Sequence, residues 1–106
     1  MTFEKILDNV RKKTAAYDAS KYNGLYAVQV TLTDLNKVFY IEIKDGNLSI
    51  EPYEYNDRQA NINISSADLA KLGNKKLDPV EAYTTGKLTV DGDLGKASEL
   101  STLFGS

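Results

Sequence analysis

The sequence predicts an α+β domain in which helices cover one side of an antiparallel sheet and water covers the other. Apolar residues alternate with polar ones in five short segments, the period of a half-buried strand. Segments at both ends instead place apolar residues every three or four positions, the period of an amphipathic helix. The length of 106 residues suits one ordinary domain with a modest core, so we expect a single domain over residues 1–106.

The N-terminal segment predicts a helix from about residue 3 to residue 16, because its apolar side chains share one face. Thr2 is placed to cap the first turn of this helix. The helical period breaks at residues 22–24, a Tyr-Asn-Gly sequence. Residues 25–32 then alternate between an apolar and a polar face, which predicts the first strand.

Three more strands are predicted in the middle of the chain. Residues 39–44 and 48–50 alternate on either side of residues 45–46, an Asp-Gly pair that supplies the positive φ angles of a tight hairpin. Residues 53–59 form a polar connection, and residues 60–65 alternate again as a fourth strand.

Two short helices are predicted after the fourth strand. The serines at 65–66 precede Asp68 in a capping arrangement, and a Gly-Asn pair at 73–74 closes this helix. The next helix opens with Asp78 at the N-cap and Pro79 at the first helical position, which suits the unpaired N–H groups of a helix start.

The chain is predicted to end with a fifth strand and a terminal helix. Residues 87–91 alternate around two apolar side chains, and Gly92 turns the chain. Asp93 can cap the helix that follows, whose apolar stripe runs from Leu94 to Phe104. The expected order is therefore helix, four strands, two short helices, one strand and one helix.

Residue types that build many reaction centres are missing. The chain has no His and no Cys, so no catalytic triad, Cys nucleophile, His/Cys zinc site or disulfide can be assembled. The carboxylate pairs Asp91/Asp93 and Asp78/Glu81 sit in a turn and at helix starts, where capping explains them without catalysis. We expect no enzyme activity, no cofactor and no bound metal.

The charge balance argues against nucleic acid as a partner. Thirteen basic and fifteen acidic residues give a net charge of −2, whereas binding to phosphates usually needs a basic excess. The basic runs at residues 11–13 and 75–76 are interpreted as solvated faces, with weak, transient attraction to anionic membrane surfaces as the alternative. No apolar run approaches the ~18 residues of a membrane span, and the N-terminus does not resemble a signal peptide. A cytoplasmic location is the default expectation, and the oligomeric state stays open.

The segment from Leu77 to Leu100 resembles the signature of the sterol carrier protein type-two domain family. That family shows a Pro-x-x-Ala helix, a Gly-Lys-Leu strand start, a Gly-Asp turn and an Ala-x-x-Leu helix ending near Leu-Phe. The matching residues, in the same order, are Pro79/Ala82, Gly86-Lys87-Leu88, Gly92-Asp93, Ala97/Leu100 and Leu103-Phe104. Residues 39–46 and 60–65 are similar to the central strands of the family, so the likeness extends over about residues 25–104.

The resemblance implies a five-stranded, mostly antiparallel sheet with helices packed on one face and an apolar tunnel between the two layers. Members of the family bind fatty acids, fatty acyl-CoA, phospholipids or sterols without transforming them. By this analogy the chain is a non-catalytic lipid carrier, and its expected partner is an apolar small molecule. The expected ligand-binding residues are Phe39, Ile41, Ile62, Ile64, Ala82, Tyr83, Leu88, Val90, Leu94, Ala97, Leu100, Leu103 and Phe104. Ordinary core packing is the alternative explanation for each of them.

Two departures from the family pattern shape the expectation. The chain ends Phe104-Gly105-Ser106 rather than in a peroxisomal tripeptide, so peroxisomal import is not expected, and its length suits one domain standing alone. The only Met is the initiator, so the tunnel lacks the residue that most readily adapts to different lipids. An empty cavity of ~300 Å³ would cost roughly 7 kcal/mol at about 24 cal/mol per Å³. Because domain stability is only ~5–15 kcal/mol, we expect the tunnel to be partly collapsed or occupied.

Two other functional classes compete with the carrier. The same fold with a filled core could serve as a protein-interaction module that uses the apolar face of its C-terminal helix. The chain could also be a detached accessory domain of a lipid-processing enzyme.

Overall fold

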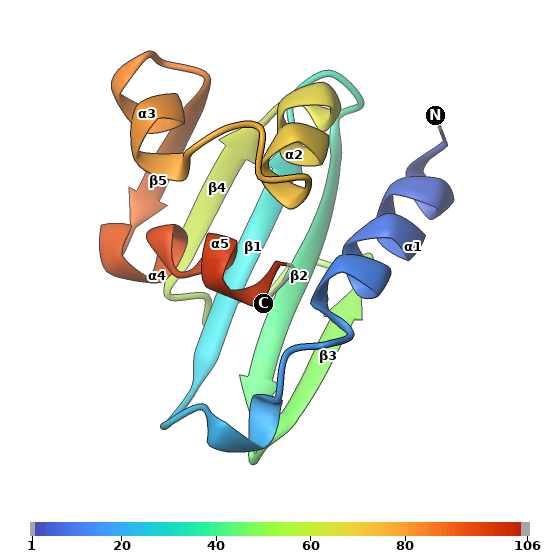
Figure 1. The fold of residues 1–106 in the computed structure, drawn as a ribbon, viewed down its shortest axis with the longest axis vertical. Coiled ribbons are helices and arrows are strands. Elements are labelled where there is room, and N and C mark those ends of the chain that lie inside the picture. Colours follow the sequence, from blue (N-terminus) through green and yellow to red (C-terminus); the bar gives the residue numbers. More distant parts are fainter. Residues whose placement is uncertain (1, 105–106) are drawn as a thin grey trace.

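The computed structural model describes residues 2–104, which form a five-stranded sheet with its helices on one side (Figure 1). Among the described residues, no helix is long and apolar enough to cross a membrane. In chain order the elements are α1 (Phe3–Thr14), η1 (Ala19–Lys21, a 3₁₀ turn), β1 (Tyr26–Leu32), β2 (Lys37–Lys44), β3 (Asn47–Glu51), β4 (Ala60–Ile64), α2 (Ser66–Gly73), α3 (Pro79–Thr84), β5 (Leu88–Gly92), α4 (Leu94–Ser98) and α5 (Leu100–Leu103).

The strand order in the sheet is β3-β2-β1-β4-β5. Three of the four pairings are antiparallel, and β1 and β4 are parallel with Val30 opposite Ile62. The predicted α+β class and mostly antiparallel sheet are therefore confirmed. The parallel pair arises because the chain leaves β3 at one edge and returns on the far side of β1.

The inner face of the sheet forms the core. α1 lies against β3 and α2, α3 lies against β5, and α4 crosses β4 and β5 (Figure 1). Burial of alternate apolar side chains beneath these helices is the main favourable contribution to folding. The buried strand residues of this face are Tyr26, Val28, Val30, Leu32, Phe39, Ile41, Ile43, Ile50, Ala60, Ile62, Ile64 and Leu88.

The outer face of the sheet differs from the expectation that water covers it. Gln29 is only 6% exposed and Asn61 only 7%, because the connection over residues 53–59 lies across them. The backbone N–H of Tyr55 donates to Gln29 Oε1 at 3.0 Å, and Gln29 Nε2 donates to Asn61 Oδ1 at 3.0 Å. The crossover to the parallel strand carries this connection over the sheet, so the alternating polar residues beneath it bond to each other and to the loop.

Both predicted terminal helices end differently from the expectation. α1 stops at Thr14, where the hydroxyl of this buried residue donates to the Val10 carbonyl at 2.9 Å. The C-terminal segment is two short helices rather than one, with the break at Glu99. The apolar stripe alone does not reveal this break, because the stripe continues on both sides of it.

Candidate functional site

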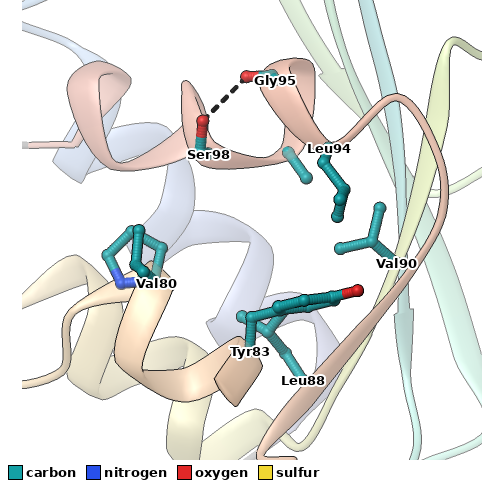
Figure 2. A pocket seen from close by; sticks show the side chains of 9 residues that line it. Val80, Tyr83, Leu88, Val90, Leu94, Gly95 and Ser98 are labelled. Carbon is teal, nitrogen blue, oxygen red and sulfur yellow. Dashed lines mark hydrogen bonds between the residues drawn. The ribbon is translucent and has the colours of Figure 1, made fainter.

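An open, mainly apolar pocket lies between α3, β5 and α4. Its volume is about 310 Å³, at the lower end of the ~300–1,000 Å³ typical of ligand pockets. Figure 2 shows Tyr83, Leu88, Val90 and Leu94 gathered on one side of the space and Val80 on the other. The lining residues are Pro79, Val80, Tyr83, Leu88, Val90, Leu94, Gly95, Ala97 and Ser98.

The α3 wall is positioned by its N-terminal cap. Asp78 accepts a hydrogen bond from the Val80 N–H at 3.0 Å, and Pro79 occupies the start of the helix, as the sequence predicts. Positions 80 and 83 then share one helical face, so Val80 and Tyr83 both line the pocket.

The α4 wall depends on a close backbone contact at Gly92. This residue has φ of +111°, and a Cβ placed on it would lie 2.6 Å from the carbonyl oxygen of Gln59. The same carbonyl accepts a hydrogen bond from the Asp93 N–H at 3.0 Å. Asp93 in turn caps α4 by accepting from the Gly95 N–H at 2.8 Å. Gly92 therefore lets the chain pass close to β4 and begin α4 across the end of the sheet.

The pocket offers apolar surface and no charge. Of the residues that the structure describes, no Asp, Glu, Lys or Arg lines it, and the Ser98 hydroxyl donates to the Gly95 carbonyl at 3.0 Å (Figure 2). Leu88 and Ala97 are buried, whereas Val80, Leu94 and Tyr83 at the mouth are 64%, 51% and 47% exposed. Such a surface can hold a hydrocarbon chain by excluding water, but it has no cation to hold an acidic head group.

The structure brings five of the predicted binding residues together in this pocket. They are Tyr83, Leu88, Val90, Leu94 and Ala97. Sequence reasoning missed Pro79, Val80, Gly95 and Ser98. The i, i+3 spacing of Val80 and Tyr83 was the signal that could have found Val80.

The other predicted binding residues lie deeper, in the packed core, and do not line this pocket. Leu103 instead borders a hollow beside Tyr22, and Phe104 borders a groove between α1 and α2. The predicted residues that are at most 1% exposed are Phe39, Ile41, Ile62, Ile64, Ala82, Leu100, Leu103 and Phe104.

The register connects the pocket to two of these core residues. Val90 pairs with Ile62 and Leu88 pairs with Ile64 across the β5–β4 ladder. Residues directly opposite in a ladder point to the same face, so the apolar floor of the pocket continues from β5 onto β4 beneath α4.

A second set of contacts holds α4 and the break at Glu99 against η1 and β1. The Tyr26 hydroxyl donates to the Lys96 carbonyl at 3.0 Å, and the Tyr22 hydroxyl donates to Glu99 Oε2 at 2.9 Å. Lys96 Nζ donates to Tyr22 Oη at 2.8 Å and lies 5.2 Å from the centre of the Tyr22 ring. These contacts tie the α4 wall of the pocket to the rest of the domain.

Burial raises the pKa of the Tyr26 phenol and, to a smaller extent, that of Tyr22. The hydrogen bond to Tyr22 raises the pKa of Lys96. Both tyrosines therefore stay neutral, and Lys96 stays charged, throughout the physiological pH range. The sequence alone showed no pattern that joins residues so far apart in the chain.

Comparison with known families and proteins gives a consistent result. The sequence model of the SCP-2 sterol transfer family matches residues 3–105. The peroxisomal multifunctional enzyme A of Dictyostelium discoideum is 28% identical over 103 residues, which cover 96% of this chain and 23% of that protein. Sterol carrier protein 2 of Oryctolagus cuniculus is 29% identical over 85 residues, covering 78% of this chain and 16% of that protein. The chain thus spans less than a quarter of these curated relatives.

Solved structures share the fold. The sterol carrier protein-2 like-3 protein of Aedes aegypti superposes with a TM-score of 0.71 at 21% identity, over 96% of this chain and 95% of that chain. The sec-alkylsulfatase Pisa1 of a Pseudomonas species superposes with a TM-score of 0.70 at 18% identity, over 94% of this chain and 14% of that chain. The same fold therefore occurs both in small proteins and as part of a larger enzyme.

Proposed function

Because the chain belongs to the SCP-2 sterol transfer family, we propose that it is a non-catalytic carrier that takes the hydrocarbon part of a lipid into the pocket between α3, β5 and α4. The observation that carries the proposal is the composition of this pocket, whose walls are apolar and whose lining has no charged side chain. A ligand with one long acyl chain suits such a site, because each buried methylene contributes about 0.8 kcal/mol without any polar contact.

The ligand is proposed to extend from the pocket into the core. Leu88 and Val90 form the entrance floor, and the sheet order leads from β5 over Ile62 and Ile64 on β4 toward Phe39 and Ile41. These inner residues are tightly packed, so an acyl chain that reaches them has to displace α4 and α5 from the sheet. The two-part C-terminal helix, broken at Glu99, supplies the joint for such a displacement.

The head group is proposed to stay at the mouth in water. Among residues 2–104, no Asp, Glu, Lys or Arg lines the pocket, so affinity should follow the length of the hydrocarbon chain and depend little on whether the head group is a carboxylate, a thioester or an alcohol. The fatty acid, acyl-CoA, phospholipid and sterol classes all remain candidates for the natural ligand.

Displacement of a fluorescent fatty acid tests the proposal. Saturable binding to the purified chain is expected, and Val80→Asp should weaken it at least several-fold because the new charge would need to be desolvated beside the ligand. Tyr53→Asp is the matched control, since Val80 and Tyr53 are both 64% exposed and only Val80 lines the pocket. Equal weakening by the two variants would contradict the assignment of the pocket.

A protein-interaction module is the second candidate. Two observations favour this function. Eight of the predicted binding residues are buried in the packed core, and Leu94 on α4 is exposed, so the C-terminal helices offer an apolar surface to a partner. The same displacement assay separates the two functions. A module with a filled core would bind no fluorescent fatty acid in the pocket between α3, β5 and α4, so Val80→Asp would leave the displacement curve unchanged.

A further inference from the structure

A second, separate groove lies between α1 and α2. Its volume is about 280 Å³, and its floor is apolar, with Ile6 and Val10 from α1, Leu69 and Ala70 from α2, and Phe104 from the chain after α5. It shares no lining residue with the pocket between α3, β5 and α4. The groove is large enough for one hydrocarbon chain and too small for most bulky ligands.

The two grooves differ in charge. Within residues 2–104, Lys13 is the only Lys, Arg, Asp or Glu that lines the α1–α2 groove. Its stem lies across the end of α2, because a Cβ on Gly73 would be 3.6 Å from Lys13 Cγ. The ion pairs among residues 2–104 are Arg11–Glu51 and Lys96–Glu99, and neither pair includes Lys13.

Lysines also occur near the end of α2. Lys71 lies on α2, and Lys75 and Lys76 follow Gly73, the residue that the Lys13 stem approaches. Arg11 points away from this end, because its guanidinium donates to the Ile50 carbonyl on β3 at 2.6 Å. The Lys75 ammonium donates a hydrogen bond to the Ser101 carbonyl.

The Asp34 carboxylate lies beside the start of α2, where it accepts hydrogen bonds from the Ser66 N–H and hydroxyl. At the Gly73 end of α2, the apolar floor with the Lys13 ammonium at its rim is complementary to a hydrocarbon chain that carries a negative charge.

We propose that the α1–α2 groove is a second ligand site, selective for single-chain amphiphiles with a carboxylate head. The hydrocarbon chain of the ligand lies on Val10, Leu69 and Phe104, and its carboxylate pairs with the ammonium of Lys13 at the rim of the groove. The site is independent of the function proposed for the other pocket. The two sites differ in selectivity. The pocket between α3, β5 and α4 recognises only the hydrocarbon chain of a ligand, whereas the α1–α2 groove also recognises the negative charge of its head group.

Titration of the ¹⁵N-labelled chain with dodecanoate, kept below its micelle concentration, tests the site by NMR. We expect the amide signals of α1 and α2 to shift in a saturable manner that is distinct from any change at α3 and β5. Ala70→Trp should abolish the α1–α2 response because Ala70 is exposed and lines the groove. Ala67→Trp is the matched control, an exposed alanine of the same helix that does not line it.

A charge test separates head-group recognition from chain binding. Lys13→Gln should weaken dodecanoate binding to the groove about two- to five-fold, the range of an exposed ion pair, and should leave dodecanol binding unchanged. Lys12→Gln, an exposed neighbour that does not line the groove, should change neither affinity.

Three results would overturn the proposal. The first is the absence of a saturable α1–α2 response to dodecanoate. The second is an equal effect of Ala70→Trp and Ala67→Trp. The third is Lys13-dependent binding to phosphatidylglycerol vesicles without any groove response to dodecanoate, which would make this surface a membrane contact instead. Because the α1–α2 and α3–β5 signals are read separately, failure of this site and failure of the carrier pocket are distinguishable.

Discussion

Removing one buried hydroxyl at Tyr26 should loosen the C-terminal helices measurably. Tyr26 is 0% exposed, and its hydroxyl donates to the Lys96 carbonyl at 3.0 Å. That carbonyl lies near the end of α4, where helical carbonyls lose their usual partners because the helix stops. In Tyr26→Phe the ring keeps its packing, whereas the carbonyl loses its hydrogen bond.

The expected cost follows from the burial of both groups. Loss of a net hydrogen bond costs about 1 kcal/mol, and an acceptor left unsatisfied in the interior adds to this, so we expect Tyr26→Phe to lower the free energy of unfolding by about 1–2 kcal/mol. For a domain of this size the melting temperature should fall by roughly 4–8 °C for each kcal/mol. Urea denaturation at pH 7 measures the change. Tyr53→Phe is the control, since the Tyr53 side chain is 64% exposed and should change stability by less than about 0.5 kcal/mol.

The pH dependence gives this prediction a second readout. Burial raises the pKa of Tyr26 in the folded state above its ordinary value near 10. A raised folded-state pKa gives a contribution that is complete below the unfolded-state pKa and is lost as pH rises above it. The advantage of the wild type over Tyr26→Phe should therefore shrink as pH increases beyond about 10. Equal stabilities of Tyr26→Phe and Tyr53→Phe at pH 7 would refute the reasoning. So would a difference in the free energy of unfolding between the wild type and Tyr26→Phe that stays constant above pH 10.

Two further predictions concern the turn before α4 and the outer face. Gly92→Ala should destabilise the fold by roughly 1–3 kcal/mol more than Gly24→Ala in urea unfolding, because both residues have positive φ but only the Gly92 Cβ would meet a backbone oxygen, at 2.6 Å; equal costs would contradict this. The hydrogen bond to Glu42 raises the pKa of Tyr55 to about 12, so its stabilising contribution should be present below pH 10 and be lost as pH rises through about 12. A ¹³C NMR titration of the phenol should show this pKa and its decrease in Glu42→Gln, and titration near 10 in the wild type would exclude the bond.

The strands and most helix boundaries were predictable because their determinants are local. Alternation specifies which side of a strand is buried, and Asp78, Pro79 and Asp93 cap the helices where the sequence places them. The five predicted binding residues that meet in the pocket follow from the same logic, since each lies on the apolar face of its own element.

Contacts between residues that are distant in the sequence could not be predicted from these local patterns. Nothing local to the connection over residues 53–59 shows that it crosses the outer face and buries Gln29 and Asn61. The contacts that hold α4 join Tyr22 to a residue 77 positions later and Tyr26 to one 70 positions later in the chain. Such pairings depend on the strand order, and the alternation pattern does not encode it.

By itself, the sequence determined which faces are apolar, where the elements start, and that His and Cys chemistry is absent. Only the tertiary structure decided that β1 and β4 run parallel, that the pocket opens between α3, β5 and α4, and that Lys13 borders a second groove. The physical reason is that periodicity reports burial along one element, whereas a cavity and its charge are properties of the space between elements. That space exists only after the chain has brought them together.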